Sequence, residues 1–234
     1  MQDAYVGDIG DFGKYGLLRL IGYNRLKLSI NWYYVIPSTQ GKQNDGKYIE
    51  YLSRPNEYRT YDTELFDGLC KLVLHDSDRK LKRIETSCLL NATYYSKPLQ
   101  NNRHLWHTNA LLDTQNADIV FLDPDNGLET ATMHQNNSAT FKHVKWDELK
   151  DYYNRGQSVI LYQHRPKMTS KTTCIQNIMK YHANYLKSDH LYILEFPKFT
   201  NRFYFFFTHN SHVSQVRDVC RYMDIHWKGL CRQL

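Results

Sequence analysis

The chain has 234 residues, of which 41% are hydrophobic and 23% are charged, and its formal net charge is +6. This composition excludes an intrinsically disordered chain, and no apolar run approaches the roughly 20 residues that a membrane-spanning helix requires. We therefore expect a globular protein that forms one domain over residues 1–234 and does not associate with a membrane.

Cysteine usage and the amino-terminal sequence indicate a cytoplasmic protein. The five cysteines are odd in number and include no CxxC pair, which argues against a disulfide framework or a structural zinc site. The first ten residues contain neither a basic segment nor an apolar core, so no signal peptide is expected. His104 and His107 have the spacing of helical metal ligands, but no acidic or thiol cluster lies nearby in the sequence, so we expect no metal site.

The positive charge, together with 19 tyrosines, 10 phenylalanines and 4 tryptophans, favours a nucleic-acid partner, either DNA or RNA. Cations bind phosphates, and aromatic rings stack on bases. The basic residues that we expect to make this contact flank one polar segment of the chain: Lys142, Lys145, Arg165, Lys167 and Lys171.

The amino-terminal segment, residues 5–16, reads YVGDIGDFGKYG and has four glycines at intervals of three. Glycine permits close backbone approach, and a loop that served only for packing would not need Asp8, Asp11 and Lys14. We therefore predict a ligand-facing loop. A helix whose start Asp11 caps should follow it and end near Arg25.

The next part of the chain alternates between strand and helix patterns. The segments 30–36, 58–61 and 80–84 are predicted strands, and Asp62 ends the second of them. Helical patterns cover 47–52, 63–74 and 99–112.

Residues 117–129 read ADIVFLDPDNGLE and contain the strongest functional signal in the chain. Ile119–Leu122 is a short apolar run, which predicts a strand buried on both faces. A proline and a glycine then end the strand. Asp123, Asp125 and Asn126 therefore lie just past its carboxyl end, where open α/β sheets bind their ligands. We predict a catalytic role for these three residues, together with Asp8 and Asp11.

The rest of the chain continues the alternation. Residues 130–140 are polar and aperiodic, which predicts a mobile loop, and 145–153 is helical. Residues 158–162 form a predicted buried strand that ends at Gln163, His164, Arg165 and Pro166. A helix over 171–186, a hairpin of 191–196 with 202–208 and a helix over 212–223 complete the order.

Strands that alternate with helices predict an α/β fold, Rossmann-like, with a mostly parallel doubly wound sheet and a C-terminal antiparallel hairpin. Neighbouring parallel strands end at the same edge of such a sheet. We therefore expect the following residues to converge on one cleft at that edge: Asp8, Asp11, Lys14, Asp123, Asp125 and His164. Tyr162 and Arg165 should bind substrate beside them.

This order of elements resembles the class I methyltransferases that use S-adenosylmethionine. In that family the fourth strand ends in an Asp/Asn-Pro-Pro-aromatic motif that holds the target amine. Asp123 and Pro124 match its first two positions, whereas Asp125 and Asn126 replace the second proline and the aromatic residue. The segment around Lys14 also looks like the glycine, acidic and lysine loop that opens the large-subunit ribosomal RNA adenine methyltransferases.

The chain departs from this family after the first strand. The family has a glycine-rich loop there, whereas residues 36–41 contain a single glycine. The resemblance implies S-adenosylmethionine as cofactor, with Asp62 at the end of the second strand in the ribose-binding role and Lys14 on the cofactor side. Asp123 would accept a hydrogen bond from an exocyclic amine, and Tyr162 would stack on a flipped base.

The alternative is a DNA glycosylase or another hydrolase that excises a modified base without a cofactor, an activity that would suit defence against phage. Asp123 or Asp125 would activate water or stabilise a glycosyl cation, and Asn126 would contact the base edge. His164 and Arg165 would donate to the leaving base or to a phosphate. LDPDNG and LYQHRP are loosely similar to the Asp-Pro turn and the later histidine loop of uracil-DNA glycosylases.

A third possibility is a nucleic-acid-binding or regulatory module without catalytic activity. Its surface would bind phosphates, and phosphates repel carboxylates. The four aspartates expected at one cleft therefore argue against this possibility.

Overall fold

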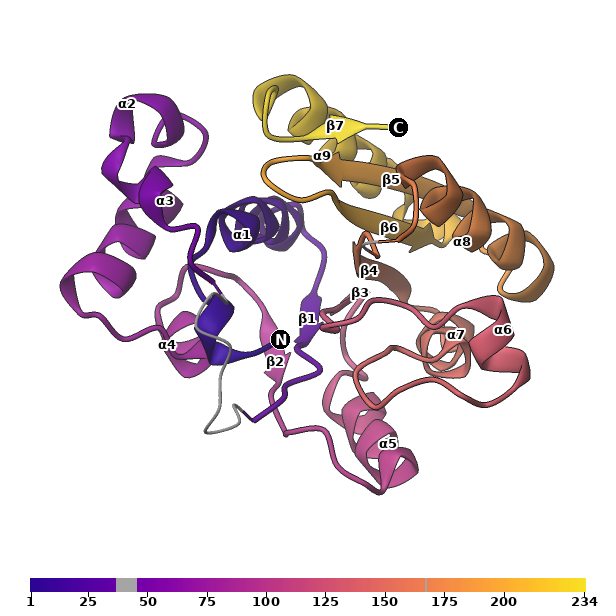
Figure 1. The fold of residues 1–234 in the computed structure, drawn as a ribbon. Coiled ribbons are helices and arrows are strands. Elements are labelled where there is room, and N and C mark those ends of the chain that lie inside the picture. Colours follow the sequence, from indigo (N-terminus) through magenta and orange to yellow (C-terminus); the bar gives the residue numbers. More distant parts are fainter. Residues whose placement is uncertain (37–45, 167) are drawn as a thin grey trace.

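The computed structural model describes residues 1–36, 46–166 and 168–234. Within these ranges the centre is a seven-stranded mixed sheet of strand order β2-β1-β3-β4-β6-β5-β7 (Figure 1). Its strands are β1 Leu28–Asn31, β2 Thr93–Tyr95, β3 Ile119–Leu122, β4 Ser158–His164, β5 His190–Phe196, β6 Arg202–Thr208 and β7 Arg232–Gln233. Strands β2, β1, β3 and β4 are parallel, whereas β6 runs antiparallel between β4 and β5.

Helices cover both faces of the sheet (Figure 1). On the first face lie α1 Ile9–Tyr23, α4 Leu81–Thr86 and α9 Val213–His226. The helices α2 Pro55–Tyr58 and α3 Thr63–Cys70 pack against α1 in the same hydrophobic cluster. The second face packs against α5 Arg103–Asp113, α7 Trp146–Asn154 and α8 Lys171–Tyr185, and the short α6 Ala131–Gln135 lies at its edge.

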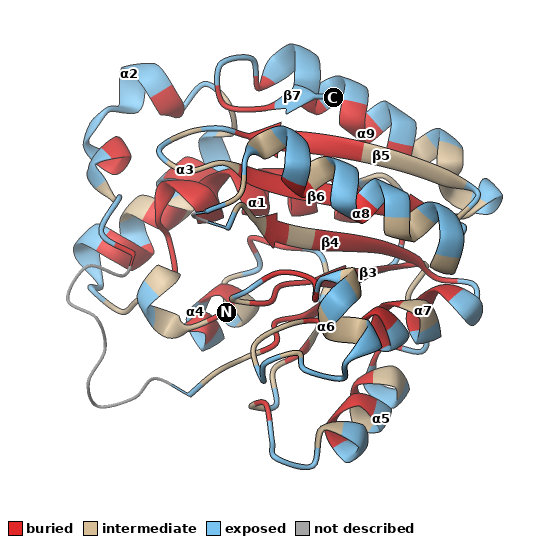
Figure 2. Cartoon of the chain, turned by 45° about the vertical axis from the view of Figure 1, so that its right-hand side comes forward, coloured by how far each residue is buried: buried red, intermediate tan, exposed pale blue. Residues whose placement is uncertain are grey.

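The central strand β3 is buried on both faces, as its apolar run predicts. Ile119 and Phe121 belong to the hydrophobic cluster on one face, and Val120 and Leu122 belong to the cluster on the other. Side chains of a strand alternate between the two faces of its sheet. Figure 2 shows the central strands and α1 as the most buried parts of the molecule.

The prediction of a loop over residues 5–16 is wrong from Ile9 onward, because Ile9–Tyr23 form the buried helix α1. Its N-cap is Asp8, whose Oδ1 accepts a hydrogen bond from the backbone N–H of Asp11 at 2.9 Å. A Cβ atom at Gly13 would lie 2.2 Å from the Phe196 ring, and one at Gly16 would lie 2.2 Å from the Trp227 ring. The glycine spacing therefore serves close packing of a helix, since residues three apart share one helix face.

The second and third predicted strands are also wrong. Residues 58–61 lie at the end of α2 and in the turn after it, and Pro55 at the start of α2 has the backbone angle that a first helical turn needs. Residues 80–84 overlap α4, in which Leu81 and Ile84 are buried at helical spacing. The second strand in the chain is β2, which has no corresponding predicted strand.

Asp62 consequently ends no strand, so the position from which the ribose-binding role was implied does not exist. It is the N-cap of α3, where its Oδ1 accepts from the N–H of Leu65 at 3.0 Å. Its Oδ2 accepts from Arg19 at 2.7 Å.

Other expected elements differ at their ends or in type. The first strand ends at Asn31, and Tyr33 beyond it has φ +44°, outside the extended region. Residues 50–53 form a 3₁₀-helix, a π-helical turn over residues 71–75 follows α3, and part of the expected mobile loop is the helix α6, capped by Thr130. The remaining expected helices and strands are present, with ends shifted by a few residues. In the described ranges no helix is both long enough and apolar enough to cross a membrane.

Candidate functional site

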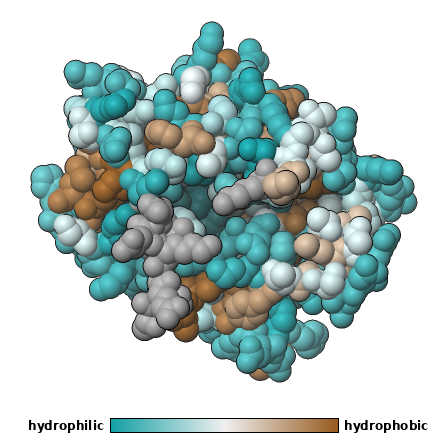
Figure 3. Space-filling model, viewed as in Figure 1, coloured by the Kyte–Doolittle hydropathy of each residue, from teal (hydrophilic) through white to brown (hydrophobic). Residues whose placement is uncertain are grey.

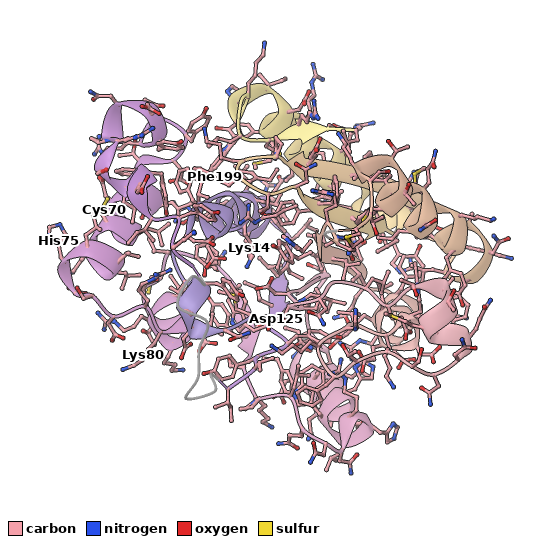
Figure 4. The ribbon with its side chains drawn as sticks, viewed as in Figure 1. Lys14, Cys70, His75, Lys80, Asp125 and Phe199 are labelled. Carbon is pink, nitrogen blue, oxygen red and sulfur yellow. The ribbon has the colours of Figure 1, made fainter. Side chains whose placement is uncertain are left out.

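A cavity of about 160 Å³ lies at the carboxyl ends of β3 and β4, and we call it the central cavity. Its lining combines the amino-terminal segment, α1, the turn after β3, the end of β4 and the start of β6: Met1, Tyr5, Asp8, Gly10, Asp11, Lys14, Asp123, Pro124, Asp125, Tyr162, His164 and Arg202. The predicted convergence of the amino-terminal acids, the strand-end acids and His164 on one cleft is confirmed. Figure 3 shows a hydrophilic hollow near the middle of this face, and in Figure 4 Lys14 and Asp125 approach it from opposite sides.

Backbone contacts fix the turn after β3. The N–H of Asp123 donates to the carbonyl of Asn31 at 3.0 Å, so the first acid of the turn is held by the sheet. Gly127 has φ +74°, and a Cβ atom there would lie 2.3 Å from the Gln163 side chain. The Gln163 Oε1 in turn accepts from the N–H of Leu128 at 2.8 Å. The turn is therefore anchored to both neighbouring strands, which gives its acidic side chains a fixed position.

Lys14 lies between two carboxylates at the back of the central cavity. Its Nζ is 2.8 Å from Asp11 Oδ1 and 2.9 Å from Asp123 Oδ2, and all three side chains are buried. Tyr15 donates its hydroxyl to Asp11 at 2.8 Å. Burial alone would lower the pKa of Lys14, but Asp11 and Asp123 raise it well above its ordinary value. Lys14 is therefore a fixed positive charge and not a base.

The two acids of the turn have pKa values shifted in opposite directions. Burial raises the pKa of Asp123, and Lys14 and the α-amino group of Met1 oppose that shift without cancelling it. For Asp125 burial also acts upward, but the α-amino group of Met1, Gln2 and Lys142 together lower its pKa. Their nitrogens lie 2.9, 2.6 and 3.1 Å from the Asp125 oxygens.

The lining of the central cavity also contains a fourth acid, Asp8, and a second buried cation, Arg202. Burial and the neighbouring Asp11 raise the pKa of Asp8, although Arg202 lies 3.9 Å away and acts in the other direction. Arg202 is absent from our sequence-based site. It is the partner of His164 in the β4–β6 register, so only the pairing of the predicted hairpin with β4 could have placed it there. Tyr162 contributes its ring, whose centroid is 5.1 Å from the Lys14 Nζ.

Asn126 and Arg165, which were also expected at the site, do not line the central cavity. The Asn126 side chain donates to the hydroxyl of Thr140 at 3.3 Å and faces a second cavity beside the first. Arg165 donates to the carbonyl of Thr169 at 2.8 Å. Both residues follow strand ends, but each side chain is held by a neighbouring loop.

The basic residues expected to contact nucleic acid do not form an unpaired group. Lys142 is 3.1 Å from Asp125, and Lys171 is 2.5 Å from Glu195. Lys145 is the N-cap residue of α7, and Lys167 lies outside the described residues. Nucleic-acid binding through this group of residues stays a prediction. Two of its members, Lys142 and Lys171, are already paired with acids of the chain itself.

The described residues do not fit S-adenosylmethionine at the place that the methyltransferase resemblance implies. After β1 come Trp32 and Tyr33, both fully buried, and the α-amino group of Met1 donates to their carbonyls at 3.1 and 3.3 Å. The central cavity is smaller than the roughly 300–1,000 Å³ of typical sites for such ligands. Of the expected loop at 36–41, residues 37–41 lie outside the described residues. Among the described residues, no group of three or more His, Cys, Asp or Glu could hold a metal ion.

Comparison of the sequence with protein-family models and with curated proteins finds no match. Function must therefore be inferred from the side chains at the central cavity. They combine two carboxyl groups of raised pKa, Asp8 and Asp123, with Asp125 of lowered pKa, a fixed ammonium group and a histidine. This set can move protons and stabilise a cation at a small reacting group.

Proposed function

We propose that this protein is an enzyme acting on nucleic acid, and that it excises a base by hydrolysing the N-glycosidic bond. The observation that carries this proposal is the pair Asp123 and Asp125, which line one cavity and have pKa values shifted in opposite directions. Two carboxyl groups tuned apart by their surroundings divide the roles in glycoside hydrolysis: one transfers protons and the other remains ionised.

Each side chain then has a role that follows from its environment. Asp123, whose pKa is raised, takes a proton from the attacking water. Asp125 stays ionised and stabilises the positive charge that develops on the sugar. The water oxygen bonds to the anomeric carbon as its bond to the base nitrogen breaks. The base leaves with the bonding electron pair and accepts a proton from His164, because imidazole can donate a proton near neutral pH.

A polymeric substrate is supported by an exposed aromatic pair beside the central cavity. The rings of Tyr48 and Phe199 stack with centroids 4.7 Å apart, and Lys47 and Lys198 lie 5.5 and 5.8 Å from those rings. Arg202 of the cavity donates to the carbonyl of Lys198 at 3.0 Å, which places this surface next to the cavity. Exposed rings flanked by lysines are typical of surfaces that bind single-stranded nucleic acid.

The test is to incubate the protein with DNA and RNA oligonucleotides that carry normal and modified bases, without added cofactor. Mass spectrometry should detect a free base and a matching abasic site. A positioned proton-transfer group contributes about a hundredfold to ten-thousandfold in rate. Asp123→Asn should therefore lower base release at least about a hundredfold. Undiminished release by this variant would contradict the proposal.

A base methyltransferase is the second candidate, and the sheet favours it. Parallel strands alternate with helices up to β4, and an antiparallel β5–β6 pair follows, which keeps the general order of elements that resembles class I methyltransferases. Asp125→Asn distinguishes the two candidates. Asp125 takes the position of a proline in the methyltransferase motif, so the loss of its charge should change the rate of methylation little. The rate of glycosidic hydrolysis should instead fall as far as it does in Asp123→Asn. Methylation that requires S-adenosylmethionine, detected as a mass increase of the base, would favour this second candidate.

A further inference from the structure

A second cavity of about 380 Å³ adjoins the central cavity, and we call it the side cavity. It lies between α6, α7, α8 and the end of β4. Asp125 and His164 line both cavities, so the two spaces meet at these side chains. The volume lies within the roughly 300–1,000 Å³ of typical small-molecule sites, and the chemistry proposed above leaves this cavity unused.

Flat and apolar side chains form most of the side-cavity wall. Trp146 and Tyr181 have ring centroids 4.9 Å apart, and Leu128, Met133 and Ile178 complete the apolar part. Asn177 adds an amide, which can pair with the edge of a ring. Such a wall suits a planar, neutral ligand, because aromatic faces stack on other rings.

The charged groups of the side cavity argue against a phosphate or a cation as its ligand. Glu129 is buried, and it already accepts from the N–H of Trp146 at 2.7 Å and lies 2.8 Å from the His134 ring nitrogen. A phosphate would be repelled by the buried carboxylate of Glu129. A cation would have to displace the protein donors that Glu129 already binds. A heteroaromatic ring without net charge meets neither obstacle.

We propose that the side cavity binds the base on which the enzyme acts. The glycosidic bond then lies at the junction formed by Asp125 and His164, with the sugar facing the central cavity. This inference rests on the proposed excision, and it names where the target base and the released product bind. The free base is a product of that reaction, so it should bind to the same cavity on its own and inhibit the enzyme.

Binding of free bases tests this inference independently of turnover. Calorimetry with adenine, guanine, cytosine and uracil should detect at least one ligand of the wild-type protein. Ala131→Trp fills the side cavity from its half-buried edge and should abolish that binding. Thr132→Trp is the matched control, because Thr132 is exposed on the same helix and does not line the cavity. Tyr181→Leu removes one aromatic wall and should weaken binding roughly 5- to 150-fold, the range of one base–aromatic stack.

The outcomes separate this inference from the proposed excision. The side cavity is supported as a base site if Ala131→Trp abolishes base binding or Tyr181→Leu weakens it, in variants that keep the wild-type melting temperature. This conclusion holds even if no oligonucleotide releases a base. Tyr181→Leu decides the matter if Ala131→Trp does not fold. Absence of binding by any free base, equal binding by all variants, or binding of S-adenosylmethionine in place of bases would overturn the inference.

Discussion

Lys14 is the residue on which the electrostatics of the central cavity depend. Its ammonium group separates Asp11 and Asp123, two buried acids that would otherwise face each other with like charge. Removing one partner of a buried ion pair costs about 3–5 kcal/mol, because the remaining charge has no compensation.

Lys14→Met should therefore lower the free energy of unfolding by about 3–5 kcal/mol at neutral pH. Urea denaturation followed by circular dichroism measures this change. Lys97→Met is the control, because Lys97 pairs with Asp113 and both side chains are exposed, and such pairs contribute little. Equal stability of the two variants would contradict a structural role for the buried ammonium group.

Asp125 makes stability depend on pH, and the direction follows from its lowered pKa. The folded state binds the proton of this carboxyl group less tightly than the unfolded state, for which the reference pKa is 3.8. Its contribution is therefore present above that value and is lost as the pH falls through the lowered pKa of the folded state. Asp125→Asn should be less stable than wild type near neutral pH, and the difference should shrink below about pH 4. Urea midpoints measured from pH 3 to 7 would show it, and a difference that grows on acidification would contradict it.

At the scale of elements, α1 links packing to the site. Its glycine row allows the Phe196 and Trp227 rings to approach the helix backbone. Asp11 and Lys14, each one residue after a glycine of that row, lie on a neighbouring stripe of the helix that reaches the strand ends. The same three-residue spacing therefore positions both the packing face and the ionisable groups.

Gly13→Ala should destabilise the protein even though alanine is the better helix former. The gain in helix propensity is about 1 kcal/mol, whereas overpacking a core costs about 1–3 kcal/mol. The added Cβ would lie 2.2 Å from the Phe196 ring, so the clash should dominate. Thermal unfolding of Gly13→Ala, Phe196→Leu and the double variant measures the coupling. The double variant should recover part of the stability, and strictly additive losses would contradict a direct clash.

At the scale of the whole molecule, the parts that the sequence predicts are those with local signals. Strand β3 and its acidic turn are recognisable because a short apolar run ends in turn-forming residues. Strand β2 is not recognisable, because three residues are too few to show a period. Arg202 reaches the central cavity through the β4–β6 register, and the side cavity is assembled from segments between residues 125 and 181. Contacts of this kind depend on tertiary packing, which no local pattern encodes.

The charge distribution of the whole molecule predicts which lysines contact a nucleic acid. Lys171 shares Glu195 with Arg232, so its charge is already compensated. Lys47 and Lys198 flank the exposed Tyr48–Phe199 pair, and these are the lysines that we expect to neutralise phosphates.

For single strands, log K falls with log salt concentration by about 0.7 for each phosphate neutralised. The double variant Lys47→Gln/Lys198→Gln should therefore lower the steepness of that dependence by about 1.4, whereas Lys171→Gln should leave it nearly unchanged. Fluorescence anisotropy of a labelled single strand across salt concentrations measures both slopes. A wild-type slope of zero, or a larger change for Lys171→Gln than for the double variant, would show that the aromatic pair and its lysines do not bind the strand.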